Sequence, residues 1–177
     1  MRKIKYIYLI LMLVGALLGP TYWFYEKLYS GEVALTMALT TTGDGSYTTQ
    51  PFKLDASMQP AGLIFLGQGH IPPTQEGSPP PTDIYLATLY KDGVKSQSIP
   101  FPLTAGDADP VFKERLLWLK KLQGADYRLE IRPARPASIT LERPRIEIRA
   151  GVQEPNNLIA TAGFMLLIFG FLMLFLG

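Results

Sequence analysis

The chain has 177 residues, a formal net charge of +2 and no cysteine, with 16 glycines and 15 prolines. The missing cysteine excludes disulfides, thiolate nucleophiles, cysteine-ligated metal clusters and c-type haem attachment, and so small a net charge gives no electrostatic case for binding nucleic acid. Two apolar ends leave room for one globular domain between them, and frequent glycine and proline are typical of short strands and turns.

The first apolar segment, residues 4–24, is predicted to be a transmembrane helix, because about 20 apolar residues in a helix cross a hydrocarbon core of roughly 30 Å. Residues 1–3 form a short N-terminus that is expected on the cytoplasmic side, because Arg2, Lys3 and Lys5 are basic. A cleaved signal peptide begins in the same way, but Gly19 is followed by Pro20 and aromatic residues, which make a poor cleavage site. We interpret the segment as an uncleaved anchor with Trp23 in the aromatic belt at the far interface.

Small residues recur in both apolar ends. Gly15 and Gly19 form a GxxxG pair in the first segment. Gly163, Gly170 and Gly177 recur every seven residues in the second predicted transmembrane helix, residues 157–177. Small residues allow helix backbones to approach closely in lipid, so these five glycines are the predicted helix-packing residues. Packing within one chain and packing between chains are both open.

The segment between the two ends, residues 30–153, has the composition of a β domain. Apolar and polar residues alternate with a two-residue period in several stretches, as at Val33, Leu35 and Met37. The predicted strands cover residues 32–42, 52–58, 62–66, 83–90, 94–103, 127–131 and 139–148. Pro144 interrupts the last of them, and since proline cannot donate to a ladder, we expect it at a bulge or on an edge strand.

Two connections in this domain have a distinctive composition. Asp92 and Gly93 separate two alternating runs, and because both residue types tolerate positive φ, the pair predicts a tight hairpin turn. Residues 67–82 are predicted to form a proline-rich loop, because prolines favour extended, solvated backbone. A plain flexible loop and a partner-docking loop are both open interpretations.

One helix is predicted within the β domain, over residues 111–122. Its apolar face contains Phe112, Leu116, Leu119 and Leu122. Packing of this face on the core is the favoured interpretation, and a membrane-surface helix is the alternative. Leu117 and Trp118 lie off the apolar face and are candidate contacts with lipid or a partner protein.

Tyr127 follows a Gly/Asp-containing turn at residues 122–126. This stretch resembles the tyrosine-corner region of immunoglobulin-like sandwiches, in which such a turn precedes a tyrosine whose hydroxyl bonds back to the backbone. The resemblance implies an architecture and no particular function. Antibody-type domains have a cysteine where this sequence has Leu129, so the resemblance implies a bacterial or fibronectin-type sandwich. A jelly roll is the nearest alternative.

Arginines interleaved with glutamates fill the last third of the domain. Cross-strand Arg–Glu pairing on a solvated sheet face is the favoured interpretation. The alternative is contact with anionic head groups or an acidic partner. Its candidates are Arg143, Arg145 and Arg149, since Arg149 lies within a few residues of the second apolar segment.

The sequence has no recognisable catalytic or metal-binding motif, so we expect no catalytic residues, no cofactor and no metal. His70 is the only histidine, and a zinc site needs further His, Cys or acidic ligands. Two minor alternatives are a copper(I) site of His70 with Met37 and Met58 and a calcium site on Asp44 or on Asp107 and Asp109.

These patterns predict a membrane-anchored, mainly-β protein. Two terminal transmembrane helices flank an Ig-like or jelly-roll-type antiparallel β-sandwich that carries one short amphipathic helix. Both termini are expected in the cytoplasm and the sandwich in the periplasm, in a bacterial inner membrane.

The expected function is that of a non-catalytic accessory or assembly subunit of a larger inner-membrane complex. Its partners would be integral membrane protein subunits and the lipid bilayer, with no nucleic acid and with homo-oligomerisation open. The alternative is an envelope sensor or carrier that binds a small ligand, lipid or metal through the sandwich.

Overall fold

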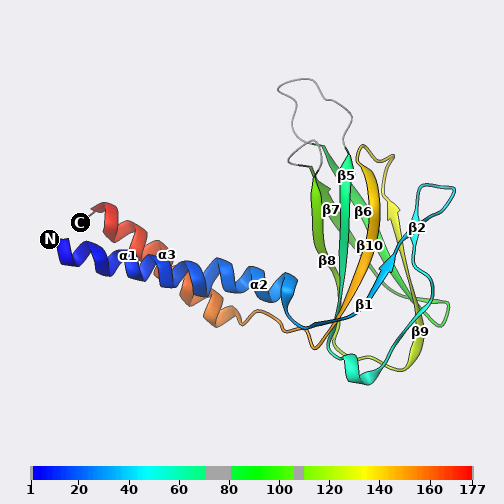
Figure 1. Cartoon of the computed structure of the whole chain (residues 1–177), viewed down its shortest axis with the longest axis horizontal. Coiled ribbons are helices and arrows are strands. Elements are labelled where there is room, and N and C mark those ends of the chain that lie inside the picture. The colour runs from blue at the N-terminus through cyan, green and yellow to red at the C-terminus, as the bar shows by residue number, and fades with distance from the viewer. Residues whose placement is uncertain (1, 71–80, 106–109, 177) are drawn as a thin grey trace. The chain divides into compact units, whose positions relative to one another are not determined.

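Two units make up the fold, and a computed structural model describes residues 2–70, 81–105 and 110–176. The helical unit combines the two ends of the chain, Met1–Ser30 and Gln153–Gly177, and the β unit is Gly31–Val152 (Figure 1). Helices α1 and α3 of the helical unit lie side by side (Figure 1).

The helical unit consists of two long apolar segments. The first begins as α1 (Arg2–Ala16), passes through a π-helical turn (Leu17–Thr21) and continues as α2 (Tyr22–Tyr29), and the second is α3 (Asn157–Leu176). Pro20 lies in the π-helical turn, where the missing proline N–H interrupts the regular helical hydrogen bonding. Two stretches, Lys5–Tyr29 and Asn157–Phe175, are long enough and apolar enough to cross a membrane, with mean hydropathies of 1.8 and 2.5.

The β unit is a mainly antiparallel β-sandwich of two sheets. Sheet A has the strand order β1-β10-β5-β8, and its strands are β1 (Glu32–Ala38), β10 (Thr140–Ala150), β5 (Ala61–His70) and β8 (Val111–Leu119). Sheet B has the order β2-β3-β9-β6-β7, and β4 also pairs with β9. Its strands are β2 (Thr40–Thr41), β3 (Tyr47–Thr48), β4 (Phe52–Leu54), β6 (Thr82–Lys91), β7 (Val94–Thr104) and β9 (Ala125–Pro133). A short 3₁₀ turn, Ala56–Met58, precedes β5.

The core lies between the two sheets and is built from alternate residues of the central strands. Its fully buried members include Leu63, Phe65, Tyr85, Leu89, Leu129, Ile131 and Ile146. Phe101 of β7 contacts both sheets, since its ring centroid is 5.7 Å from that of Phe65 and 5.8 Å from that of Tyr85. Burying one such side chain stabilises the fold by roughly 1.5–3 kcal/mol. A slip of one residue would expose the apolar side chains of a strand, so the alternation of apolar and polar residues determines which face of each strand points inward.

Residues 111–119 form strand β8, so the predicted helix over residues 111–122 is wrong. The reason is a β-bulge. Opposite Leu63 and Ile64 of β5, strand β8 has one extra residue, Leu116. Phe112 and Leu116 are four residues apart and share a face in a strand as well as in a helix. The bulge then shifts the phase of the alternation, so that Leu117 also faces the core.

Three predicted connections have different outcomes. Asp92 and Gly93 form the β6–β7 turn with φ of 49° and 80°, which confirms the hairpin. Pro144 lies at a register shift of β10, an interior strand, which confirms a bulge there. The predicted loop over residues 67–82 is shorter than expected, because residues 67–70 belong to β5 and Thr82 begins β6. The rest of it, residues 71–80, lies outside the described residues.

Replacing Gly93 with alanine is expected to destabilise the β unit by about 1–2 kcal/mol, the cost of placing an L-residue in the left-handed region. An added Cβ at Gly93 would meet no atom within 4 Å, so the cost comes from the backbone alone. Urea denaturation of the full chain in detergent measures this loss. Gly124→Ala is the matched control, because Gly124 has equally open space without a positive φ. Equal shifts in both variants would contradict the prediction.

Candidate functional site

Four of the predicted helix-packing glycines form one contact, in which α1 and the π-helical turn after it pack against α3. A Cβ on Gly19 would lie 2.8 Å from the backbone nitrogen of Phe164, and one on Gly170 would lie 2.7 Å from that of Met12. Gly15 and Gly163 are also enclosed by the backbone of the opposite helix. Real Cβ atoms do not approach so closely, so the contact requires glycine. These four glycines therefore pack within the chain. The fifth, Gly177, lies outside the described residues.

Aromatic side chains gather near the end of the first helical segment. Trp23 is 37% exposed, and the Nζ of Lys27 lies 4.9 Å from its ring centroid. A cavity of about 500 Å³ is lined by Pro20, Thr21, Phe24, Tyr25 and Tyr29. A group of aromatic side chains at the end of an apolar helix is typical of a membrane–water interface. Contact of Trp23 with lipid or a partner stays a prediction.

Leu117 and Trp118 have opposite environments. Leu117 is 1% exposed and belongs to the core, so its predicted contact with lipid or a partner is wrong, because the bulge turns it inward. Trp118 is half-buried opposite Gly62. The guanidinium of Arg115 is 4.9 Å and the Nζ of Lys120 is 5.9 Å from its ring centroid. Its Nε1 is buried and has no hydrogen-bond partner among the residues that the structure describes.

Two of the arginines in the last third of the domain form ion pairs along a strand. Arg149 Nε lies 2.6 Å from Glu147 Oε1 on β10, and Arg132 pairs with Glu130 on β9. The partners are two residues apart and therefore share a face of the sheet. These two pairs run along a strand, whereas cross-strand pairing was the favoured interpretation.

Arg143 lies in the bulge of β10 and Arg145 follows the bulge, and both are exposed. They line a cavity of about 240 Å³ on sheet A, together with Leu66, Gly67, Gln68, Val111, Phe112 and Glu142. On β8, which is separated from β10 by β5, burial lowers the pKa of the Lys113 amino group, while Glu147 raises it and Arg149 lowers it. The Lys113 amino group is thus partly removed from water, and its charge interacts with those of Glu147 and Arg149.

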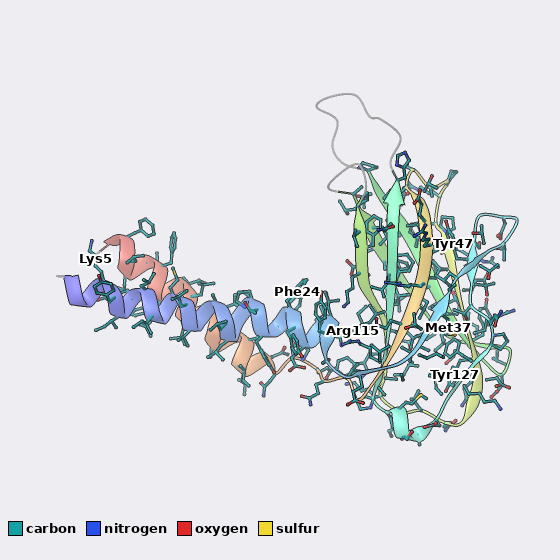
Figure 2. The ribbon with its side chains drawn as sticks, viewed as in Figure 1. Lys5, Phe24, Met37, Tyr47, Arg115 and Tyr127 are labelled. Atoms are coloured by element: carbon teal, nitrogen blue, oxygen red, sulfur yellow. The ribbon has the colours of Figure 1, made fainter. Side chains whose placement is uncertain are left out.

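Tyr127, labelled in Figure 2, lies near the start of β9. Its hydroxyl donates a hydrogen bond to the carbonyl oxygen of Gln123 at 3.3 Å, the kind of bond that the tyrosine-corner resemblance implies. Its ring stacks on Phe52 with centroids 6.1 Å apart. A cavity of about 500 Å³ adjoins it, lined by Pro51, Tyr90, Asp92, Gly93, Asp126, Tyr127 and Arg128.

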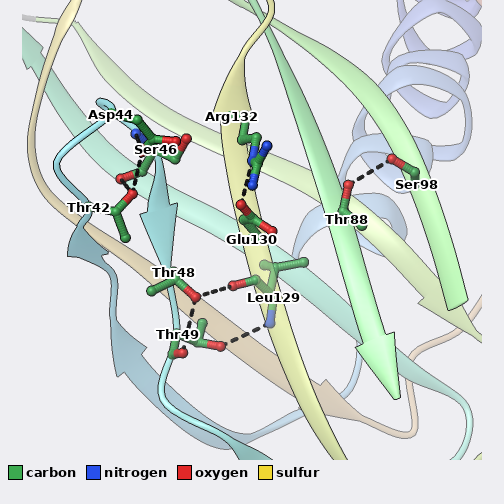
Figure 3. A network of polar contacts seen from close by, with 10 residues as sticks. All are labelled: Thr42, Asp44, Ser46, Thr48, Thr49, Thr88, Ser98, Leu129, Glu130 and Arg132. Carbon is green, nitrogen blue, oxygen red and sulfur yellow. Dashed lines mark hydrogen bonds and ion pairs between the residues drawn. The ribbon is translucent and has the colours of Figure 1, made fainter. Parts of the chain in front are cut away.

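Polar side chains tie the strands of sheet B together (Figure 3). Leu129 N donates to Thr49 Oγ1 at 3.0 Å, which attaches the segment after β3 to β9. On the paired strands β6 and β7, Thr88 Oγ1 and Ser98 Oγ lie 2.9 Å apart. The hydrogen-bonding groups of these side chains are paired within the sheet, so their role is structural.

The turn before β3 is expected to lose its side-chain order in strong acid. Thr42 Oγ1 donates to Asp44 Oδ1 at 2.6 Å and Ser46 N donates to the same oxygen at 3.1 Å. These bonds, the one from Thr42 foremost, lower the pKa of Asp44 from 3.8 to about 2. Because the pKa of Asp44 is lower in the fold than in the unfolded chain, its ionised carboxylate stabilises the folded turn. This stabilisation is complete above pH 3.8 and is lost as pH falls through about 2.

An NMR titration of the Ser46 amide checks this prediction and should give a midpoint near pH 2. Thr42→Val removes the principal donor and should move the midpoint up toward 3.8. A midpoint that is the same in both proteins would contradict the assignment to the Thr42 hydroxyl.

Within residues 2–70, 81–105 and 110–176, no group of three or more His, Cys, Asp or Glu could hold a metal ion. The copper alternative fails on geometry. Met37 (Figure 2) aligns through Ile146 of β10 with Phe65, whereas His70 lies five residues further along β5, roughly 17 Å away. Of the calcium alternatives, the one at Asp107 and Asp109 lies outside the described residues.

These features define a β-sandwich protein with two apolar helical segments. No protein-family model matches the sequence, and no curated protein matches it. One similar solved structure is that of infectious bursal disease virus, Gx strain, with 14% identity and a TM-score of 0.33 over 74% of this chain and 33% of that chain. The chain therefore spans about a third of the length of that viral chain.

Proposed function

We propose that this chain is a non-catalytic accessory or assembly subunit of a larger protein complex in a bacterial inner membrane. In this proposal α1 and α3 cross the bilayer, both termini are cytoplasmic, and the sandwich is periplasmic. The basic residues Arg2, Lys3 and Lys5 before the apolar run of α1 support this orientation. The bond from Tyr127 to Gln123 supports an Ig-like type of sandwich.

The observation that carries the proposal is the glycine contact between α1 and α3. Because the small residues of both helices are used within the chain, the helix pair is a preformed unit whose outer surface is available to other membrane proteins. That surface includes a stripe on α3 with exposed Phe164, Ile168, Phe171 and Phe175. The rings of Phe171 and Phe175 are 4.7 Å apart. In lipid, close packing of such shapes is a main source of helix association.

The test is mild solubilisation of native membranes, affinity purification of this chain and quantitative mass spectrometry. We expect larger integral membrane subunits to co-purify in a fixed ratio. A double variant, Phe164→Leu with Phe171→Leu, keeps the helix apolar but changes the shape of the stripe, and it should lower the recovery of partners. Ala162→Leu is the control on another exposed part of α3. Recovery of the unaltered chain alone, or only as a homo-oligomer, would overturn the proposal.

One observation favours the alternative of an envelope sensor or carrier. The cavity beside Tyr90, Tyr127 and Arg128 has a volume of about 500 Å³, which lies within the range of small-molecule sites. A sensor or carrier would be recovered alone and would be stabilised against unfolding by its ligand, whereas a subunit would be recovered with its partners.

A further inference from the structure

The bulge in β10 creates a charged pocket on sheet A. Glu142 pairs with Gln68 and Arg145 pairs with Leu66, so two residues of β10 lie opposite the single residue Gly67. Residues three positions apart on a regular strand point to opposite faces. The bulge restores Glu142 and Arg145 to the same face, where both line the cavity of about 240 Å³ defined above.

The surrounding structure holds the bulge in a conformation that is unfavourable for its own residues. Arg143 has φ of +48°, which few residues other than glycine adopt. Pro144 is buried, and its carbonyl oxygen accepts a hydrogen bond from Leu39 N at 2.9 Å. Such over-determined strain is frequent at binding sites. Here it holds two guanidinium groups and one carboxylate around the same small cavity.

We propose that this Arg143–Arg145 pocket receives an acidic side chain from a partner polypeptide. The proposal rests on the proposed function as a subunit of a complex. The positive charges of Arg143 and Arg145 and the negative charge of Glu142 sum to +1, which one carboxylate of a partner would balance. A planar guanidinium group also binds a carboxylate through two parallel hydrogen bonds. The rest of the lining includes Leu66, Val111 and Phe112, which suits an apolar neighbour of that acidic residue.

The size of the pocket favours a side chain of a partner polypeptide over a larger ligand. Its volume is about 240 Å³, roughly the volume that eight water molecules occupy in the liquid. Sites for drug-sized ligands are larger, at roughly 300–1,000 Å³. The pocket therefore suits one side-chain head group.

The test is a photo-cross-link in the full chain in native membranes. The photoreactive residue p-benzoylphenylalanine replaces Val111, which lines the pocket and is 75% exposed. The control position is Val94 on sheet B, which is 70% exposed. We expect the cross-link from position 111 to map to a partner polypeptide within a few residues of an Asp or Glu, and we expect no such product from position 94.

Charge reversal then tests the chemistry. Arg145→Glu should lower the cross-link at least tenfold, whereas Arg135→Glu, the same charge change at an exposed residue outside the pocket, should leave it unchanged. Replacing the mapped acidic residue of the partner with Arg should restore the cross-link to the Arg145→Glu chain. Arg143→Asn is a second variant that tolerates the positive φ and should also lower the cross-link, in case Arg145→Glu does not fold.

The outcomes separate this inference from the proposed function. A cross-link to lipid overturns the inference, as does a partner cross-link that persists in both arginine variants. If membrane subunits still co-purify in a fixed ratio in those cases, the proposed function stands. If the unaltered chain co-purifies with no partner, both are overturned.

Discussion

Replacing Gly163 with leucine is expected to separate α1 from α3. A side chain at Gly163 would begin inside the backbone of Leu18 and Gly19, and backbone atoms cannot move aside as a flexible side chain can. Overpacking of this kind costs about 3 kcal/mol, which shifts the pairing equilibrium on the order of a hundredfold. Gly163→Ala should show the same direction, because the clash begins at Cβ.

The chain has no cysteine, so spin labels can be placed only where cysteines are introduced. Cysteines at the exposed residues Tyr6 and Leu172 report the separation of the two helices by electron paramagnetic resonance in bilayers. The unaltered pair should give a narrow distribution of distances and Gly163→Leu a broad, longer one. Ala162→Leu adds the same side chain at an exposed neighbouring position and should leave the distribution narrow. A broad distribution in the unaltered chain would refute the glycine contact.

Replacing Leu117 with alanine is expected to cost the β unit about 2–5 kcal/mol, the usual penalty for truncating a buried leucine. Leu117 is 1% exposed, and it lies opposite Leu63, which is fully buried. Urea denaturation of the full chain in detergent measures the loss. This large effect is specific to a strand, because a helix over residues 111–122 would leave Leu117 off the apolar face.

Val111→Ala is the matched control on the same strand, since Val111 is 75% exposed. Its expected change is within about 0.5 kcal/mol, as for most surface substitutions. Equal, small effects of both variants would mean that Leu117 is exposed and would return residues 111–122 to the helical interpretation.

Most strands of the β unit were predictable because alternation follows directly from burial on one face of a sheet. Leu35 and Met37 of β1 show this, since both pack against the core, whereas Val33 lies beyond a register shift and is 51% exposed. Strand β8 was not predictable by the same rule, because a bulge changes the phase of the alternation and imitates the spacing of a helix. The extra residue, Leu116, is identified only by the register of β8 against β5.

The candidate binding residues were predictable in kind but not in grouping. Glycine spacing correctly indicated the packed faces of α1 and α3, yet only their geometry shows that the faces meet within one chain. Arg143 and Arg145 were recognisable as basic residues near a proline. The pocket also needs Val111 of β8, which lies more than 30 residues away in the sequence, and no local pattern encodes that pairing.

The attachment of the two units has a mechanical consequence. β1 and β10 are hydrogen-bonded neighbours, and Glu32, which follows α2 closely, pairs with Ala150, the last residue of β10 before the connection to α3. Both strands therefore leave the sandwich from the same end of one ladder. A force that pulled the two helices apart would break that ladder one hydrogen bond at a time, which is the weakest direction for an antiparallel pair. The glycine contact between α1 and α3 opposes the same separation, so its loss would leave the β1–β10 ladder to resist such a force alone.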